Sequence, residues 1–76
     1  MVNPNELGQK LIAVLAPSVG DFMAKAKVTA ACHLCGTEID AVDRAHRAPV
    51  ADRLEALCNS LGPNVAKSIK ERAAAI

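Results

Sequence analysis

Hydrophobic residues recur every three or four positions along most of the chain, which is the spacing of amphipathic helices. In the first stretch they are Leu7, Leu11, Val14 and Leu15. The residues before them predict a helix start: Asn3 can cap free backbone N–H groups, Pro4 suits the first helical position, and Glu6 can complete a capping box. Pro17 predicts the end of this helix, because proline disfavours helical geometry for the residue before it.

Ser18 is predicted to open a second helix. Its apolar stripe is expected to comprise Val19, Phe22, Met23 and Ala26. The sequence is compatible with two ends for this helix. It can reach Leu34 and stop at Gly36, since glycine is a favoured terminator. Alternatively, residues 27–31 are extended, because Val28 lies off the stripe and valine and threonine prefer strands.

The cysteine-containing segment is followed by another predicted helix start, in which Thr37 and Asp40 form the capping pair. On the helix expected after it, one face is shared by Ile39, Val42 and His46. A side chain on this face is expected to point inward. His46 therefore becomes a candidate for an interior site.

The clearest apolar stripe begins after Pro49, which predicts a new helix start. The stripe comprises Val50, Leu54, Leu57, Cys58 and Leu61. Gly62 and Pro63 are expected to terminate it, and Asn64 to cap a last helix. That helix carries Val65, Ile69 and Ile76 on its apolar side, with Lys67, Lys70, Glu71 and Arg72 directed to water.

These patterns predict an all-α fold, a compact bundle of four or five short helices in which residues 1–76 form one small helical domain. Composition adds a constraint. The apolar fraction is 51%, but fifteen of these residues are alanine and only 21 are large (Val, Ile, Leu, Met, Phe). Small domains with so little apolar volume usually gain a disulfide, a metal ion or a partner subunit.

The charge balance argues against a general affinity for nucleic acids. Nine basic and eight acidic residues leave a net charge of +1, whereas nonspecific binding to phosphates needs a cationic surface. Residues 55–72 place Gly62 where a helix-turn-helix has its turn, but Cys58 and Ser68 occupy positions where that motif has a small and an apolar residue. A nucleic-acid-binding regulator is therefore kept as the second alternative function.

The chain is expected to be cytoplasmic and not associated with a membrane. Residues 11–16 are apolar, but they are too few to span a bilayer and lack the flanks of a signal peptide. Three cysteines, an odd number, suit a disulfide framework poorly. We therefore expect the thiols to be reduced, or to bind a metal ion.

Cys32 and Cys35, followed by Gly36, have the spacing of a metal-binding knuckle, which would lie between the second and third helices. Two further residues on predicted inward faces, His46 and Cys58, would complete a tetrahedral set of three thiolates and one imidazole. The sequence thus predicts one structural Zn²⁺ per chain, bound by Cys32, Cys35, His46 and Cys58. In the alternative interpretation, His46 and Cys58 are ordinary core residues.

The same pair also permits thiol-redox chemistry, because two cysteines at this spacing can close a disulfide. Redox sites of this type usually place the pair at the start of a helix that follows a strand. Here a helix is expected to precede Cys32, and no alternation of strands and helices is visible. A thiol-redox protein is the first alternative function.

The stretch CHLCGTEIDAVDR resembles the opening of the zinc finger in the DksA/TraR family, through Cys32, Cys35, Gly36, Ile39 and Arg44. The resemblance covers about a dozen residues and implies zinc binding by the two cysteines. The second cysteine pair of that family has no counterpart here. The first segment also lacks an acidic tip, so the family's contact with RNA polymerase is not carried over.

These observations favour a small protein-binding or regulatory module, an adaptor or inhibitor of a larger protein machine, rather than an enzyme. No glycine-rich phosphate loop or catalytic triad is visible, and a chain of this size has little room for a pocket of about 300 Å³ or more. A protein partner is therefore expected. Alanine-rich faces let helices pack closely, so they are also compatible with a homodimer.

Overall fold

The computed structural model describes residues 3–76, and Met1 and Val2 lie outside it. The described chain forms four α-helices: α1 (Glu6–Val19), α2 (Asp21–Leu34), α3 (Arg47–Leu57) and α4 (Pro63–Ala75). Two short 3₁₀ turns accompany them, η1 (Arg44–His46) before α3 and η2 (Asn59–Leu61) after it. No strand occurs in the described part, which confirms the predicted all-α class.

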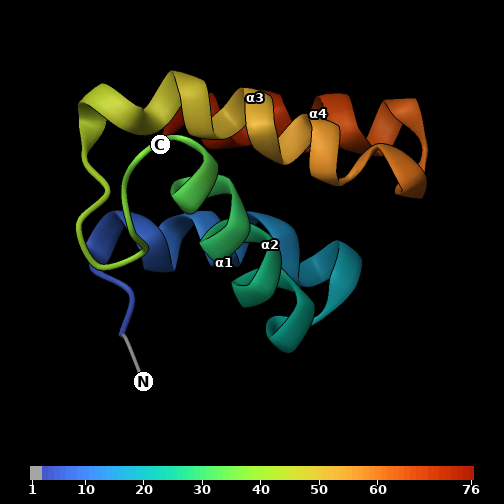
Figure 1. Cartoon of the computed structure of the whole chain (residues 1–76). Coiled ribbons are helices and arrows are strands. Elements are labelled where there is room, and N and C mark those ends of the chain that lie inside the picture. Colours follow the sequence, from blue (N-terminus) through green and yellow to red (C-terminus); the bar gives the residue numbers. More distant parts are fainter. Residues whose placement is uncertain (1–2) are drawn as a thin grey trace.

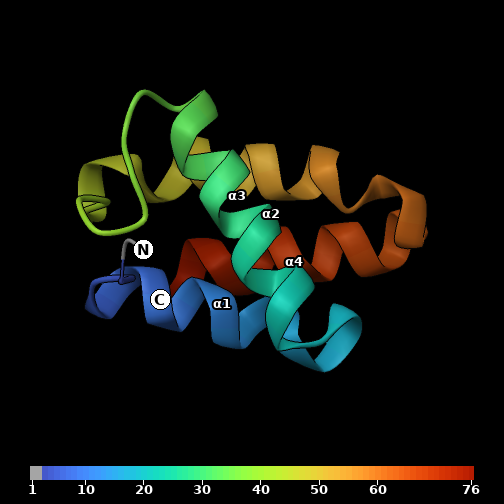
Figure 2. The same cartoon turned by 60° about the horizontal axis from the view of Figure 1, so that its bottom comes forward.

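The helices form two pairs that face each other. In Figure 1, α3 and α4 run side by side along the top, and α1 and α2 lie below them. Figure 2 shows α2 running obliquely across the molecule, in contact with both α1 and α3. The core between the helices is built mainly from small and branched side chains: Leu11, Leu15, Ala24, Val28, Ala31, Cys32, Ile39, Val42, Val50, Ala51, Leu54, Cys58, Ala66, Ile69 and Ala73.

The first helix begins later than the sequence indicated. Asn5, not Asn3, is the cap: its side-chain oxygen accepts from the Gly8 N–H at 2.8 Å. Pro4 therefore precedes the helix instead of opening it. The Asn5 amide also donates to the Val42 carbonyl oxygen at 2.8 Å, so one side chain both caps α1 and holds the distant loop.

Pro17 does not end α1, contrary to expectation. It lies inside the last turn, and the helix continues to Val19. The end comes at Gly20, whose φ of 85° is favoured only for glycine, and whose N–H donates to the Ala16 carbonyl oxygen at 2.8 Å. Gly20 also precedes Asp21, the first residue of α2, so Ser18 does not open the second helix.

The apolar stripe predicted for α2 does not face the core. Phe22 is 84% exposed and Met23 46% exposed. The buried residues of this helix are Ala24, Val28, Ala31 and Cys32. Small side chains on that face let α2 lie close to α1 and α3, and Val28 belongs to the core. Of the two ends that the sequence allowed, the structure has the longer helix, ending at Leu34 before Gly36 with a φ of 78°.

No α-helix starts at Thr37. The chain turns from Cys35 to Asp43, and only the 3₁₀ turn η1 precedes α3. Ile39 and Val42 are nevertheless buried, as predicted, because backbone bonds from the Asn5 side of α1 fix the loop, including Asn5 N–H to the Ile39 carbonyl oxygen at 3.1 Å. The packing there is tight: a Cβ on Gly8 would lie 2.6 Å from the Ile39 oxygen.

The last two helices follow the sequence closely. α3 begins at Arg47, two residues before Pro49, since proline is tolerated in a first turn whose N–H groups have no helical partner. Val50, Leu54 and Cys58 are buried as expected, whereas Leu61 is 40% exposed. Gly62, not Asn64, precedes α4, and Pro63 is its first residue. Among the described helices, none is long and apolar enough to cross a bilayer.

Candidate functional site

The cysteine pair lies at the end of α2. Cys32 is fully buried in its last turn, and Cys35, at the helix end, is partly exposed. The pKa of the Cys32 thiol is raised to about 11, first by burial and then by the negative charges of Cys35 and Glu38. The pair is therefore close together, but at neutral pH Cys32 is held as a neutral thiol.

Cys58 lies in different surroundings. It follows the last residue of α3 and is fully buried. Burial raises the pKa of its thiol, and the nearby charge of Lys27 lowers it in part. Lys27 also donates from Nζ to the Leu57 carbonyl oxygen at 3.1 Å. The charged neighbour of Cys58 is thus Lys27, a cation halfway along α2. The charged neighbours of Cys32 are Cys35, at the end of α2, and Glu38, in the loop that follows.

The His46 side chain forms its hydrogen bond within its own turn, η1. Its Nδ1 accepts from the Asp43 N–H at 3.2 Å, while the Asp43 carboxylate accepts from the Ala45 N–H at 2.9 Å. This reciprocal pair caps η1. The side chain is only partly buried, because the helix expected to turn it inward does not form. His33, which stands between the two cysteines in the sequence, lies on the exposed side of α2, with its Nδ1 3.5 Å from the Glu38 carboxylate.

The structure does not bring the four predicted ligands into one group. Within residues 3–76, no three histidine, cysteine, aspartate or glutamate side chains lie close enough together to hold a metal ion. Only Cys32 and Cys35 are neighbours. Zinc binding by Cys32, Cys35, His46 and Cys58 stays a prediction, and the described geometry adds no support to it.

The redox alternative also finds little support in this geometry. The nucleophile in disulfide exchange is the thiolate, and a thiol with a pKa of about 11 is almost entirely protonated at neutral pH. The pair lies at the end of a helix, where no free backbone N–H groups stabilise a thiolate. Neither feature favours fast exchange at Cys32.

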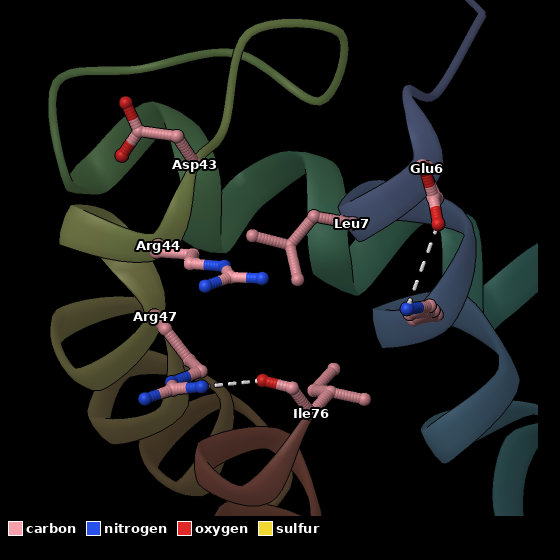
Figure 3. A pocket seen from close by; sticks show the side chains of 7 residues that line it. Glu6, Leu7, Asp43, Arg44, Arg47 and Ile76 are labelled. Atoms are coloured by element: carbon pink, nitrogen blue, oxygen red, sulfur yellow. Dashed lines mark hydrogen bonds and ion pairs between the residues drawn. The ribbon is translucent and has the colours of Figure 1, made fainter.

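A cleft of about 460 Å³ separates the start of α1 from the start of α3, larger than a chain of this size was expected to hold. Figure 3 shows Arg44 and Arg47 pointing into it, beside Leu7 and Ile76. Arg47 donates to the Ile76 carbonyl oxygen at 2.5 Å, and on the far side Glu6 pairs with Lys10 at 3.7 Å. The Arg47–Ile76 bond ties the start of α3 to the end of α4, whereas the Glu6–Lys10 pair lies within α1. Anionic Glu6 and Asp43 offset the positive charge of the two arginines.

The outer face of α2 carries a largely apolar hollow. Its volume is about 660 Å³. Six lining residues share one side of the helix: Phe22, Lys25, Ala26, Thr29, Ala30 and His33. Glu38 closes the end near His33. We call this surface the α2 groove.

Sequence reasoning placed Phe22 and Ala26 of the α2 groove in the core. The signal that was available is a second apolar stripe on the same helix, made of Ala24, Val28, Ala31 and Cys32. A helix with two apolar stripes can bury only one of them in a bundle of this size. The other stripe is then left on the surface.

No protein family model, curated protein or solved structure matches this chain.

Proposed function

We propose that this chain is a protein-binding module that acts as an adaptor or inhibitor, and that it docks on its partner through the α2 groove. The observation that carries the proposal is the position of Phe22. This residue is the only aromatic side chain in the sequence, and 84% of its surface is exposed at one end of an apolar hollow.

Exposure of this kind has a cost that a partner removes. Full burial of a phenylalanine side chain contributes roughly 1.5–3 kcal/mol, which the isolated chain does not gain. Met23 and Leu34, outside the groove, are also large and apolar, and they are 46% and 54% exposed on the same helix. Exposed apolar surface that forms a hollow on a small protein usually marks an interaction site.

The shape of the groove favours a helical partner. Ala26, Thr29 and Ala30 are small, so an incoming helix can approach the α2 backbone closely. Side chains at intervals of three, four and seven residues on such a helix would lie along the groove. Lys25, one turn from Phe22, and Glu38, beside His33, give the groove one charge of each sign, which favours a partner with complementary charges.

A photo-reactive phenylalanine analogue tests the site directly. Placed at Phe22, it should form a discrete adduct in extract from the native source. At Ala74, which is exposed on α4, it should form none. An excess of unlabelled protein should suppress the adduct, and the same excess of an Ala26→Glu variant should not. Adducts of equal yield from positions 22 and 74, or none from position 22, would refute the proposal.

The structural zinc ion is a separate part of the predicted function and has its own test. If Cys32, Cys35, His46 and Cys58 bind it, the purified chain should contain one zinc ion, and a chelator should lower its melting temperature. Cys58→Ser should then weaken zinc binding. A folded chain that contains no metal would remove the ion and leave the α2 groove unaffected, since the groove contains none of these residues.

A further inference from the structure

We infer that the boundary between α1 and α4 binds an acidic amphipathic helix of a partner protein. Its carboxylates would lie on basic side chains of this chain, and its apolar side chains between them. This surface shares no lining residue with the α2 groove. It is therefore a second binding surface, and its existence does not depend on the first.

Three hollows along this boundary adjoin one another. The cleft of about 460 Å³ shares Lys10 and Ile76 with a hollow of about 550 Å³. That hollow shares Val14 and Arg72 with a third, of about 260 Å³. In Figure 2, α1 and α4 lie next to each other along this line. We call the three adjoining hollows the α1–α4 furrow.

The apolar side chains of the furrow have a spacing that fits a helix. Leu7, Val14 and Ile76 line it and are each partly buried, so apolar surface remains accessible between the charged residues. Leu7 and Val14 are seven positions apart on α1, about 10 Å along the axis. Apolar side chains separated by seven residues on a docked helix have the same separation, as in other grooves that bind amphipathic helices.

Positive charge predominates along the furrow. Four of the nine basic residues of the sequence line it: Lys10, Arg44, Arg47 and Arg72. Its acidic lining residues are Glu6 and Asp43, both in the cleft at one end. Glu6 pairs with Lys10 at 3.7 Å, and the Asp43 carboxylate accepts from the Ala45 N–H at 2.9 Å. Both carboxylates therefore already have partners.

The arginines, in contrast, have donors to spare. Among residues 3–76, neither Arg44 nor Arg72 has a side-chain hydrogen bond or ion pair. Arg47 donates to the Ile76 carbonyl oxygen, which leaves other N–H groups of its guanidinium for a ligand. Figure 3 shows Arg44 pointing into the cleft. Because a guanidinium can bind a carboxylate through two parallel hydrogen bonds, an acidic partner is the complementary one.

The shape of the surface favours a polypeptide over other anionic partners. A bilayer is flat and cannot reach apolar side chains that lie in a furrow. Single-stranded nucleic acids usually stack their bases on aromatic side chains, and the one aromatic residue of this sequence, Phe22, lines the α2 groove instead. A helix with apolar and acidic faces meets both the apolar lining and the charges. With two separate surfaces, the chain could hold two partners at once.

Two helical peptides of opposite charge test the inference. Both have leucines at intervals of three, four and seven residues over about 14 residues; one has glutamate at the flanking positions and the other lysine. Fluorescence anisotropy with the full chain should show at least about tenfold tighter binding of the glutamate peptide. The preference should weaken as salt is added, because the charges lie at an exposed surface.

A double variant locates the bound peptide. Arg44→Glu with Arg72→Glu should weaken binding of the glutamate peptide about tenfold and strengthen binding of the lysine peptide. The matched control is Arg53→Glu with Lys67→Glu, which changes net charge by the same amount at exposed positions outside the furrow. The control should bind both peptides nearly as the wild type does. Circular dichroism should confirm that both double variants remain helical.

Three results would overturn the inference: equal affinity for the two peptides, no binding of either up to millimolar concentration, or a furrow variant that binds like its control. Tighter binding to phosphatidylglycerol vesicles or to duplex DNA than to the glutamate peptide would also overturn it, since the partner would then be a lipid surface or a nucleic acid.

The two surfaces can be told apart with the Ala26→Glu variant. Because Ala26 lines the α2 groove, this variant should bind the glutamate peptide like the wild type. Loss of binding in Ala26→Glu would place the peptide in the α2 groove and refute the furrow. The proposed function fails separately, on the crosslinking at Phe22, which the furrow variant should leave unchanged.

Discussion

The two faces of α2 differ in a way that reverses the usual relation between size and burial. The inner face carries Ala24, Val28, Ala31 and Cys32, all fully buried, and the largest of these is a valine. The outer face carries Phe22, of which only 16% is covered, since 84% is exposed. Helix α2 contacts both α1 and α3 (Figure 2), and the side chains that it buries there are small. Which face is buried was therefore decided by how closely the helices can approach, and the larger residue was left for the surface.

The largest difference between the two faces should appear in the free energy of unfolding when one residue on each face is replaced by alanine. Val28→Ala removes two carbon atoms from a closed interior and should lower the free energy of unfolding by about 2 kcal/mol. Phe22→Ala removes far more atoms, yet in the monomer it should cost less than about 0.5 kcal/mol, because the ring is exposed. Urea unfolding at low protein concentration measures both.

The test depends on which of the two substitutions lowers the free energy of unfolding more. If Phe22→Ala cost more than Val28→Ala in a monomeric sample, the ring would be part of the core, and the α2 groove would not be a free surface.

The second prediction concerns the inner-face thiol. The pKa of Cys32 is raised from an ordinary 9.0 to about 11, mainly by burial. Between pH 9 and 11 the unfolded chain loses this proton while the folded chain keeps it, so rising pH favours unfolding. The contribution of the Cys32 thiol to the free energy of unfolding is fully present below pH 9. It should be lost by pH 11, which lowers that free energy by up to about 2 kcal/mol.

Urea midpoints measured between pH 8 and 11 under reducing conditions test this slope. Cys32→Ala should flatten the curve, although not completely, because burial also raises the pKa of Cys58. Cys35→Ala is the matched control: this thiol is partly exposed, and most of the slope should remain. Parallel curves for the wild type and Cys32→Ala would show that Cys32 titrates alike in both states and is not buried as described.

The same contrast shows how much of this fold could be predicted from the sequence. The helical class and the stripe of Val50 and Leu54 followed from spacing and residue type. Ile39 and Val42 are buried as expected, but in a loop and not on the predicted helix. The phase of α2 did not, because this helix is apolar on both sides. Hydrophobicity favours Phe22 for the core, and only the distance to α1 and α3, a tertiary property, favours alanine instead.

The predicted site shows a related limit. Cys32 and Cys35 are neighbours because four residues of one helix end fix their separation. Bringing His46 to them required a helix from Thr37 onward, and the loop instead follows bonds from Asn5 to Ile39 and Val42. Such bonds join residues more than thirty positions apart, so local patterns carry no information about them. The position of Cys58 beside Lys27 has the same origin.

The smallest effect should come from Lys27, at the border between the two faces. Its partly buried side chain donates to the Leu57 carbonyl oxygen at 3.1 Å, where the end of α3 has unpaired carbonyl groups and a favourable site for a cation. Lys27→Met keeps the aliphatic stem but removes the donor and the charge. It should lower the free energy of unfolding by about 1 kcal/mol. It should also raise the pKa of Cys58, since Lys27 is the group that lowers it.

Lys67→Met is the matched control, because that lysine is exposed on α4 and the same change there should cost less than about 0.3 kcal/mol. Alkylation of Cys58 followed against pH provides the second readout, in a Cys32→Ala, Cys35→Ala background, where Cys58 is the one remaining thiol. Lys27→Met and Lys67→Met could instead have the same effect on the free energy of unfolding and on the alkylation of Cys58. In that case the bond from Lys27 to Leu57 would not anchor α2 to α3. The close crossing that keeps Phe22 outside would then need another cause.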